Sequence, residues 1–315
     1  MSARHPIRFG FQTWQQNVTW RQLLALWQEC EELGFDSGWN FDHLIPIFSD
    51  PAGPCLEAWT LLAGLAMHTS KLRIGTLVTG NTYRHPTVLA KMAVTVDHMS
   101  GGRLNFGLGA SWFELEHWAY DIAFPKTTER LQMLDEALQV IKLLWSEAEP
   151  TYTGKYYQLR DAYFQPKALQ QPHPPIMIGA SGEKVALRVV AKHADIWNTF
   201  GSPELFRHKI GVLGEHCRRI GRNVEEIEKS VLIGLTLTDD RACAQRAIQS
   251  TATRWGVSPR EAKSRLLVGS VQAIVEQVEA FIEVGVTHFI LMLAPPFDSA
   301  ALRTFASGVM SRFHC

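Results

Sequence analysis

Two ionisable residues, Asp42 and His43, interrupt an apolar stretch in the segment GWNFDHLIPIF. Histidine is the side chain that gains and loses a proton near neutral pH, so it suits acid–base chemistry. A neighbouring carboxylate can orient the imidazole or act on a ligand itself. The same two residues would also fit a helix cap, a hydrogen-bonded core position or a solvated turn. The elements that position the pair must therefore decide between these roles.

Short apolar runs alternate with longer amphipathic segments along the whole chain. Strands are predicted at 7–14, 37–41, 72–80, 103–111, 175–181, 195–200, 227–238 and 287–293. Helices are predicted at 19–34, 56–69, 87–100, 127–147, 182–193, 202–221, 240–255 and 259–285 and from 298 onward. Strands that are apolar on both faces and alternate with helices are typical of covered parallel sheets. The pattern predicts an α/β fold, a closed (β/α)8 TIM barrel, with an open doubly wound sheet as the alternative.

The segment 151–175 breaks this alternation. It is rich in aromatic residues, proline and glycine, and it follows the fourth predicted helix. This composition indicates a β-hairpin-like insertion or a flap over an active site. No linker of low complexity divides the chain, so residues 1–315 are predicted to form a single domain that contains this insertion.

Composition excludes several classes of function. The chain has 31 basic and 31 acidic residues and no basic run, so it lacks the electrostatic signature of nucleic-acid binding. Its five cysteines are scattered and contain no CxxC, which favours reduced thiols in the cytoplasm. No secretory leader and no apolar run of membrane-spanning length is evident. The sequence ELEH matches a metal-binding Glu-x-x-His spacing only once, and no HExxH occurs, so we expect no metal site.

Polar, small and aromatic residues gather where the predicted strands end. In a (β/α)8 barrel the reacting groups lie at the C-terminal ends of the strands, which all open at one mouth. The residues expected there are Gln12, Thr13, Trp14, Asp42, His43, Val78, Thr79, Gly80, Asn81, Thr82, Gly109, Ala110, Ser111, Trp112, Gly179, Ala180, Ser181, Gly182, Trp197 and Asn198.

The segment IGASGEK, residues 178–184, is the best candidate for binding an anion. Small residues allow close approach to the backbone, and the following helix offers N–H groups at its positive end. Ser181 can add a hydroxyl, while Lys184 and Arg188 can add charge. An ordinary strand–helix turn is the alternative. The other glycine motif, GLGASW, has Trp112 where a dinucleotide fingerprint needs its third glycine, so an orthodox Rossmann site is disfavoured.

Several of these motifs together resemble one known family. The stretches FDHL, RHPTVLAKMAVTVDHMSGGR and PPIMIGASGEKVALRVVAKHADIWN are similar to bacterial-luciferase-like flavin and deazaflavin oxidoreductases, and most similar to the branch that uses coenzyme F420. The resemblance covers nearly the whole chain. It implies a tricyclic cofactor in the barrel mouth, F420 or alternatively FMN.

The resemblance also implies roles for individual residues. In relatives a non-proline cis peptide supports the ring; the matching bond here is Leu77–Val78 or Val78–Thr79. The cofactor phosphate would lie at Gly179–Gly182. His43 would handle the substrate proton, and Asp42 would orient it or contact the ring. Relatives that oxidise sugar phosphates carry a glutamate near Trp112, whose absence disfavours that activity; Glu114 or Glu116 stands nearby as an acid or base instead.

Three functions follow from this resemblance. The leading hypothesis is hydride transfer between the deazaflavin C5 and a small organic substrate. The second is a monooxygenase that uses reduced FMN and oxygen. The third is a non-catalytic F420- or flavin-binding protein. The resemblance also implies a homodimer.

Overall fold

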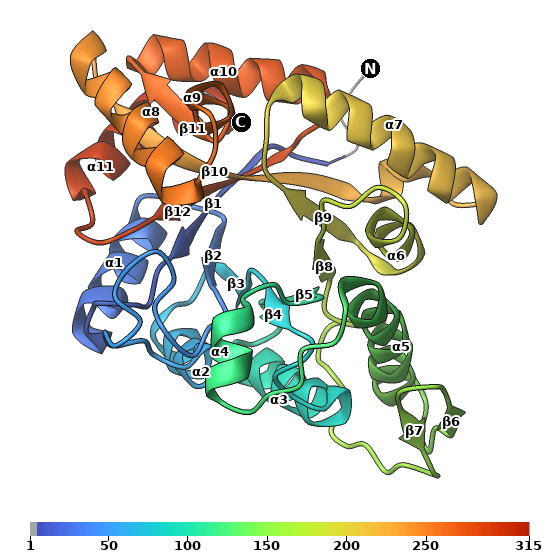
Figure 1. Cartoon of the computed structure of the whole chain (residues 1–315). Coiled ribbons are helices and arrows are strands. Elements are labelled where there is room, and N and C mark those ends of the chain that lie inside the picture. The colour runs from blue at the N-terminus through green and yellow to red at the C-terminus, as the bar shows by residue number, and fades with distance from the viewer. Residues whose placement is uncertain (1–4, 315) are drawn as a thin grey trace.

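Eight parallel strands close into a barrel in the computed structural model, which describes residues 5–314 (Figure 1). They are β1 (Arg8–Thr13), β2 (Ser37–Asn40), β3 (Arg73–Thr76), β5 (Leu104–Gly109), β8 (Ile176–Gly179), β9 (Ile196–Thr199), β10 (Glu228–Leu237) and β12 (His288–Leu293). Strand β10 pairs with both β9 and β12, and β12 pairs with β1, so the ring has no open edge. The predicted (β/α)8 barrel is confirmed, and the open sheet is excluded.

Helices surround the barrel on its outside (Figure 1). They are α1 (Trp20–Glu32), α2 (Ala58–His68), α3 (Pro86–Met99), α5 (Thr127–Ser146), α6 (Ala186–His193), α7 (Pro203–Arg219), α8 (Arg241–Trp255), α10 (Val271–Glu283) and α11 (Ser299–Gly308), with the short α4 (Glu114–Ala119) and α9 (Pro259–Lys263). Helix α1 shows how the sequence sets these bounds. Thr19 and Gln22 form a capping box at its start, and Gly34, at φ 84°, follows its end. None of the helices in residues 5–314 is both long and apolar enough to cross a membrane.

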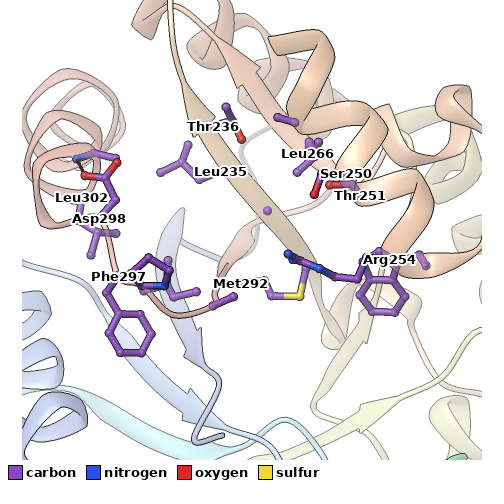
Figure 2. A pocket seen from close by; sticks show the side chains of 17 residues that line it. Leu235, Thr236, Ser250, Thr251, Arg254, Leu266, Met292, Phe297, Asp298 and Leu302 are labelled. Atoms are coloured by element: carbon purple, nitrogen blue, oxygen red, sulfur yellow. Dashed lines mark hydrogen bonds between the residues drawn. The ribbon is translucent and has the colours of Figure 1, made fainter. Parts of the chain in front are cut away.

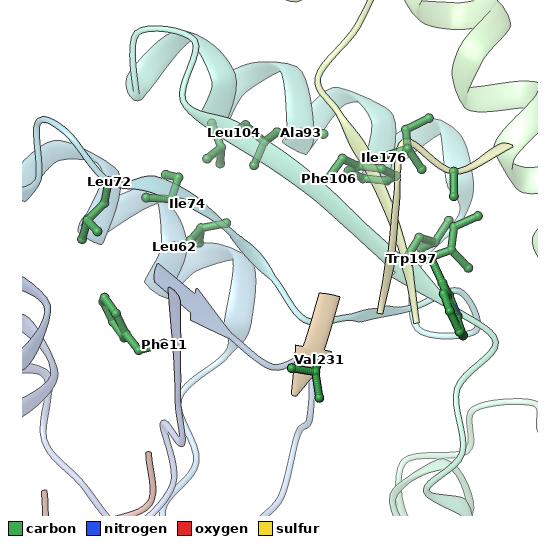
Figure 3. Close-up of a cluster of buried hydrophobic side chains, with 14 of the residues drawn as sticks. Phe11, Leu62, Leu72, Ile74, Ala93, Leu104, Phe106, Ile176, Trp197 and Val231 are labelled. Carbon is green, nitrogen blue, oxygen red and sulfur yellow. The ribbon is translucent and has the colours of Figure 1, made fainter. Parts of the chain in front are cut away.

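The main core lies between the barrel and its helices. Figure 3 shows Phe106, Ile176 and Trp197 packed together from the neighbouring strands β5, β8 and β9. A smaller cluster fills the barrel interior, where Trp39, Met177 and Ile290 are buried. Burying a large apolar side chain contributes about 1.5–3 kcal/mol, so these two layers fix the barrel and therefore the positions of its strand ends.

Two predicted elements differ from the structure. The third predicted strand, 72–80, is split into β3 and β4 (Thr79–Gly80) by a cis peptide bond at Leu77–Val78, the first of the two bonds that the family resemblance pointed to. The prediction of one continuous helix over 259–285 was wrong. The segment contains a strand, β11 (Leu266–Gly269), which pairs with the C-terminal part of β10. Gly269 has φ 131°, which a helix cannot contain, and Ser270 then caps α10.

The segment 151–175 begins with a small hairpin of β6 (Tyr152–Thr153) and β7 (Gln158–Leu159), as its composition indicated. Figure 1 shows the hairpin beside α5, at the outer edge of the molecule. Glu136 of α5 accepts hydrogen bonds from the backbone N–H groups of Lys155 and Tyr156, at 3.0 and 2.9 Å. Asp97 of α3 holds the later part by accepting from Leu169 N–H at 2.8 Å. The segment is therefore fastened along two outer helices, and this placement does not support a flap over the barrel mouth.

A buried polar cluster closes the N-terminal end of the barrel. His288 lies 2.9 Å from the Ser37 hydroxyl through Nε2, and its Nδ1 is 3.9 Å from Glu228 Oε1. Burial, with the positive charges of Arg8 and Arg73 nearby, lowers the pKa of His288 to about 3. Burial raises the pKa of Glu228. The imidazole is therefore neutral in the folded protein at any pH near neutrality.

This neutral imidazole makes stability depend on pH. The ordinary pKa of an unfolded histidine is about 6.5, so between pH 6.5 and 3 the unfolded chain binds a proton that the folded protein does not. The contribution of His288 is therefore present above pH 6.5, and it falls by about 1.4 kcal/mol per pH unit below that. We expect His288→Gln to flatten the decline in the free energy of unfolding between pH 7 and 5.5, measured by urea denaturation. An unchanged slope would contradict a neutral buried His288.

Candidate active site

A cavity of about 670 Å³ opens at the C-terminal ends of the barrel strands. Its size lies within the range of roughly 300–1,000 Å³ that is usual for small-molecule sites. Of the residues that the sequence predicted for a site, it is lined by Gln12, Asp42, His43, Leu77, Val78, Thr79, Ser111, Trp112, Gly179, Ala180, Ser181 and Gly182, together with Trp14 and Asn198. The strand ends therefore meet at one mouth, as the barrel fold requires.

Several other predicted residues lie outside the cavity lining. Thr13 is buried, and its hydroxyl donates to the Trp39 carbonyl at 3.3 Å and accepts from Trp27 Nε1–H at 3.0 Å. Asn81 is buried and donates a hydrogen bond to the Tyr157 hydroxyl at 3.3 Å, so it ties the end of β4 to the outer hairpin. Glu116, which is fully buried, lies behind His43. Glu114 is exposed, so the structure distinguishes between the two glutamates that the sequence left open.

Glycines on two strands make room for the peptide at the end of β3. A Cβ atom on Gly109 would lie 2.7 Å from Val78 Cγ2, and one on Gly179 would lie 3.1 Å from the same atom. Neither strand could carry a side chain there without moving Val78. Gln12 donates a hydrogen bond to the Leu77 carbonyl at 2.7 Å and holds the other side of the same bond. One face of the cavity is therefore small, smooth and fixed in place.

His43 is held from behind by a buried carboxylate. Its Nδ1 lies 2.6 Å from Glu116 Oε1, while Oε2 of the same carboxylate accepts from Leu44 N–H at 2.7 Å. The Tyr83 hydroxyl also donates to Glu116. Burial by itself raises the pKa of Glu116, but the hydrogen bonds from His43, Tyr83 and Leu44 outweigh it, so its pKa lies below the ordinary value. An ionised Glu116 accepts a hydrogen bond from Nδ1–H of His43, so Nε2 is the ring nitrogen that is left to contact a ligand.

Asp42 points to a different partner. Its carboxylate accepts two hydrogen bonds from Arg84, at 2.6 and 3.0 Å, and a third from Gly80 N–H at 3.1 Å. Arg84 also bonds Glu57, the N-cap of α2. Burial lowers the pKa of Arg84, but Asp42 and Glu57 outweigh this effect and raise it. Asp42 therefore fastens the β4 turn to the end of β2, and it is Glu116 that bonds the imidazole of His43.

The end of β8 forms the polar part of the cavity. Ser181 Oγ lies 2.9 Å from Thr199 Oγ1, and both residues line the cavity. Helix α6 begins at Ala186, also in the lining, with no side chain capping it. The predicted cations Lys184 and Arg188 are exposed and do not line the cavity. Lys209 of α7 is the buried cation behind the loop, and it donates to the Ser181 carbonyl at 2.6 Å.

Sequence reasoning missed several residues of the site. Tyr83 and Arg84 follow the β4 end directly in the sequence NTYRHP, so their position was the available signal. The site also includes Phe48, Phe200, Lys209, Trp255 and Arg265, which come from three separate regions of the chain. No spacing in the sequence connects them, because only the fold brings them to one place.

A second cavity, of about 270 Å³, lies behind this mouth between β10, α8 and the segment before α11. It shares Trp255 and Met292 with the main cavity. Figure 2 shows Arg254 reaching toward Met292 at its inner side, with Phe297 and Asp298 across from them. Within residues 5–314, no group of three or more His, Cys, Asp or Glu residues is placed to hold a metal ion.

The family model described as luciferase-like monooxygenase matches residues 5–263. The chain belongs to this family. It is therefore an oxidoreductase, as the sequence motifs indicated. A curated relative, an F420-dependent glucose-6-phosphate dehydrogenase from Microbacterium testaceum, is 32% identical over 76% of this chain and 71% of its own length. Another protein of that name, from Kineococcus radiotolerans, is 26% identical over 97% of this chain and 96% of its own.

Solved structures of low identity share the fold of this luciferase-like protein. An F420-dependent secondary alcohol dehydrogenase has a TM-score of 0.87 at 21% identity, covering 98% of this chain and 99% of its own. The monooxygenase RslO1 from Streptomyces bottropensis has a TM-score of 0.80 at 19% identity, covering 98% and 100%. At such identities these likenesses establish the barrel and not the substrate.

The Asp42–Arg84 pair gives a test of how the mouth is held together. Arg84→Met would leave a buried carboxylate without its cation, so we expect the free energy of unfolding to fall by about 3–5 kcal/mol. The double variant Asp42→Asn with Arg84→Met should recover part of that loss. Arg218→Met removes an exposed ion pair with Glu215 and should leave stability within experimental error. If the two arginine variants were equally stable, Asp42 would not depend on Arg84.

Proposed function

We propose that this protein is an F420-dependent oxidoreductase that transfers a hydride between the deazaflavin C5 and a small organic substrate. The observation that carries the proposal is the placement of His43, backed by Glu116, on the wall of a cavity that also has a smooth, small-residue face. The F420-dependent dehydrogenases at 26–32% identity support the choice of cofactor.

The residues present fit a tricyclic cofactor. A flat ring needs a face without protruding side chains, and Val78, Gly109, Ala110 and Gly179 provide one. A phosphate on the cofactor needs N–H and hydroxyl donors, which the uncapped start of α6 and the Ser181 and Thr199 hydroxyls supply. When bound, the deazaflavin would supply a ring carbon that gives or takes a hydride.

Proton transfer falls to His43 in this proposal. Glu116 fixes the ring orientation and holds the Nδ1 proton, so Nε2 is the atom that gives a proton to the substrate oxygen or takes one from it. Asp42, with both oxygens bonded to Arg84 and one also to Gly80, keeps the β4 turn in place and transfers no proton. Tyr83 secures the second side of Glu116. A homodimer and a cytoplasmic location stay predictions.

The cofactor can be tested directly. We expect purified protein titrated with F420 to quench or shift the fluorescence of the deazaflavin ring in a saturable way, and FMN to bind more weakly. Turnover should then proceed without oxygen, because hydride transfer does not consume it. Oxygen consumption coupled to reduced FMN would instead establish the monooxygenase, and tight F420 binding with no redox turnover would establish a storage or binding protein.

Variants of His43 and Glu116 test whether these residues act in the chemical step or in cofactor binding. We expect His43→Ala to lower kcat by about 10²- to 10⁴-fold, the usual contribution of acid–base catalysis, with the dissociation constant for F420 within about twofold of the original. Glu116→Gln keeps the shape but not the charge and should lower kcat by less than the loss of the imidazole does. Glu114→Gln, on the exposed face of the same helix, is the matched control. An equal loss of F420 affinity and rate in His43→Ala would remove its catalytic role.

A further inference from the structure

The side of the cavity beyond His43 is built from aromatic rings. Its lining includes Trp14, Phe41, Phe48, Trp112, Phe200 and Trp255, which we call the aromatic wall. Phe48 is in its middle, with ring centroids 4.6 Å from Trp255, 5.7 Å from Trp14 and 6.3 Å from Trp112. His43 contacts the wall edge-on, with its ring 5.6 Å from that of Trp112. The residue proposed to transfer the proton is therefore flanked by flat apolar surfaces.

The aromatic wall remains partly open. Trp112 is 54% exposed and Phe48 is 37% exposed, although both are large apolar side chains at the mouth of a cavity. Large apolar side chains gathered around a concave site usually mark a surface that a ligand covers. The face formed by Val78, Gly109 and Gly179 fits the cofactor, so the aromatic wall is the part left for the substrate.

The charges in the lining do not favour a phosphorylated substrate. Arg265 is the one lysine or arginine among the lining residues, and it donates to Glu261 at 2.6 Å. Its guanidinium also lies over the rings of Phe200 and Trp255, at 4.3 and 4.9 Å. Asp42, the lining carboxylate, is occupied by Arg84. The donors at the start of α6 are taken by the cofactor phosphate in the proposed function, and the lining cation that remains for a second phosphate already has a carboxylate partner.

We infer that the substrate is a planar apolar carbonyl compound, or the corresponding alcohol, that lies against Phe48, Trp112 and Trp255. This inference rests on the proposed function. In the reducing direction the carbonyl carbon takes a hydride from the reduced deazaflavin, its C=O π bond breaks, and the oxygen takes the proton from His43. The product is an alcohol, and the cofactor is oxidised by two electrons. Stacking on the aromatic wall places the carbonyl beside the imidazole.

The test compares three probes on the cofactor-loaded protein. They are 2-naphthaldehyde, which is planar, cyclohexanecarbaldehyde, which is apolar but not planar, and glucose 6-phosphate. We expect 2-naphthaldehyde to bind most tightly by calorimetry with the oxidised cofactor, and to have the highest kcat/KM with the reduced one. Tighter binding of glucose 6-phosphate, or equal affinities for the two aldehydes, would overturn the inference.

Variants of Trp112 test whether the aromatic wall causes the preference for the planar aldehyde. Trp112→Leu keeps an apolar side chain but removes the flat ring, so it should weaken 2-naphthaldehyde binding by about two- to tenfold and leave cyclohexanecarbaldehyde unchanged. Trp112→Phe should restore most of the difference. Trp118→Ala removes a tryptophan that is 80% exposed and outside the cavity lining, and it should have no effect. An equal loss for both aldehydes in Trp112→Leu would contradict stacking.

A wrong cofactor and a wrong substrate class would give different experimental results. If F420 does not bind and FMN does, the proposed function fails, and the same binding comparison on the FMN-loaded protein still tests the aromatic wall. If F420 binds and the planar aldehyde shows no preference, the proposed function stands and the inference about the substrate fails.

Discussion

The geometry of the site depends on one buried carboxylate. Glu116 is fully buried on the short helix α4, and its two oxygens accept from the His43 ring, the Leu44 backbone and the Tyr83 hydroxyl. A buried carboxylate is tolerated only where donors replace the water it has lost, so these three groups are fixed as firmly as Glu116 itself. They belong to the loop after β2 and the turn after β4, so Glu116 connects these two segments. The orientation of the imidazole is thus a consequence of how donors from two loops satisfy one anion.

A second buried carboxylate, that of Asp42, stabilises the strand ends next to this network. Asp42 joins the end of β2 to the turn after β4 through Arg84 and Gly80, and Arg84 continues to Glu57 at the start of α2. Adjacent residues in sequence, Asp42 and His43, therefore face different networks. Their separation has a physical reason. A carboxylate bonded to a guanidinium has little capacity left to polarise an imidazole, whereas Glu116 has no lysine or arginine bonded to it among residues 5–314. In the proposed function, the short motif Asp-His therefore carries one structural and one chemical residue.

The sequence was sufficient for the barrel and for one half of the site. Apolar runs of strand length recur between amphipathic helices. Six of the eight barrel strands, from β1 to β9, end at or just before the small or polar residues expected there, because period and position along a strand are local properties. Strands β10 and β12 instead end in Leu237 and Leu293. Strand β11 was predicted as part of a helix. Leu266–Val268 shows no alternation of apolar and polar residues, and its pairing with β10 depends on residues far away in the chain. The aromatic wall was hidden for the same reason: Phe48 and Trp255 are far apart in the chain, and no local pattern indicates that their rings lie 4.6 Å apart.

The two sides of the cavity, the small-residue face and the aromatic wall, also differ in the elements that form them. The small-residue face is formed by barrel strands, where a Cβ on Gly109 or Gly179 would collide with Val78, so it tolerates little change. The aromatic wall includes loop residues and the end of α8, and the exposed rings of Phe48 and Trp112 can be exchanged at small cost to the barrel. In the proposed function, the cofactor therefore lies on a face fixed by the fold, and the substrate lies on a face that includes loop residues. In this chain Trp112, which follows Ser111, adds its ring to the aromatic wall beside His43, and we infer that the wall as a whole suits the outer half of the cavity to flat apolar molecules.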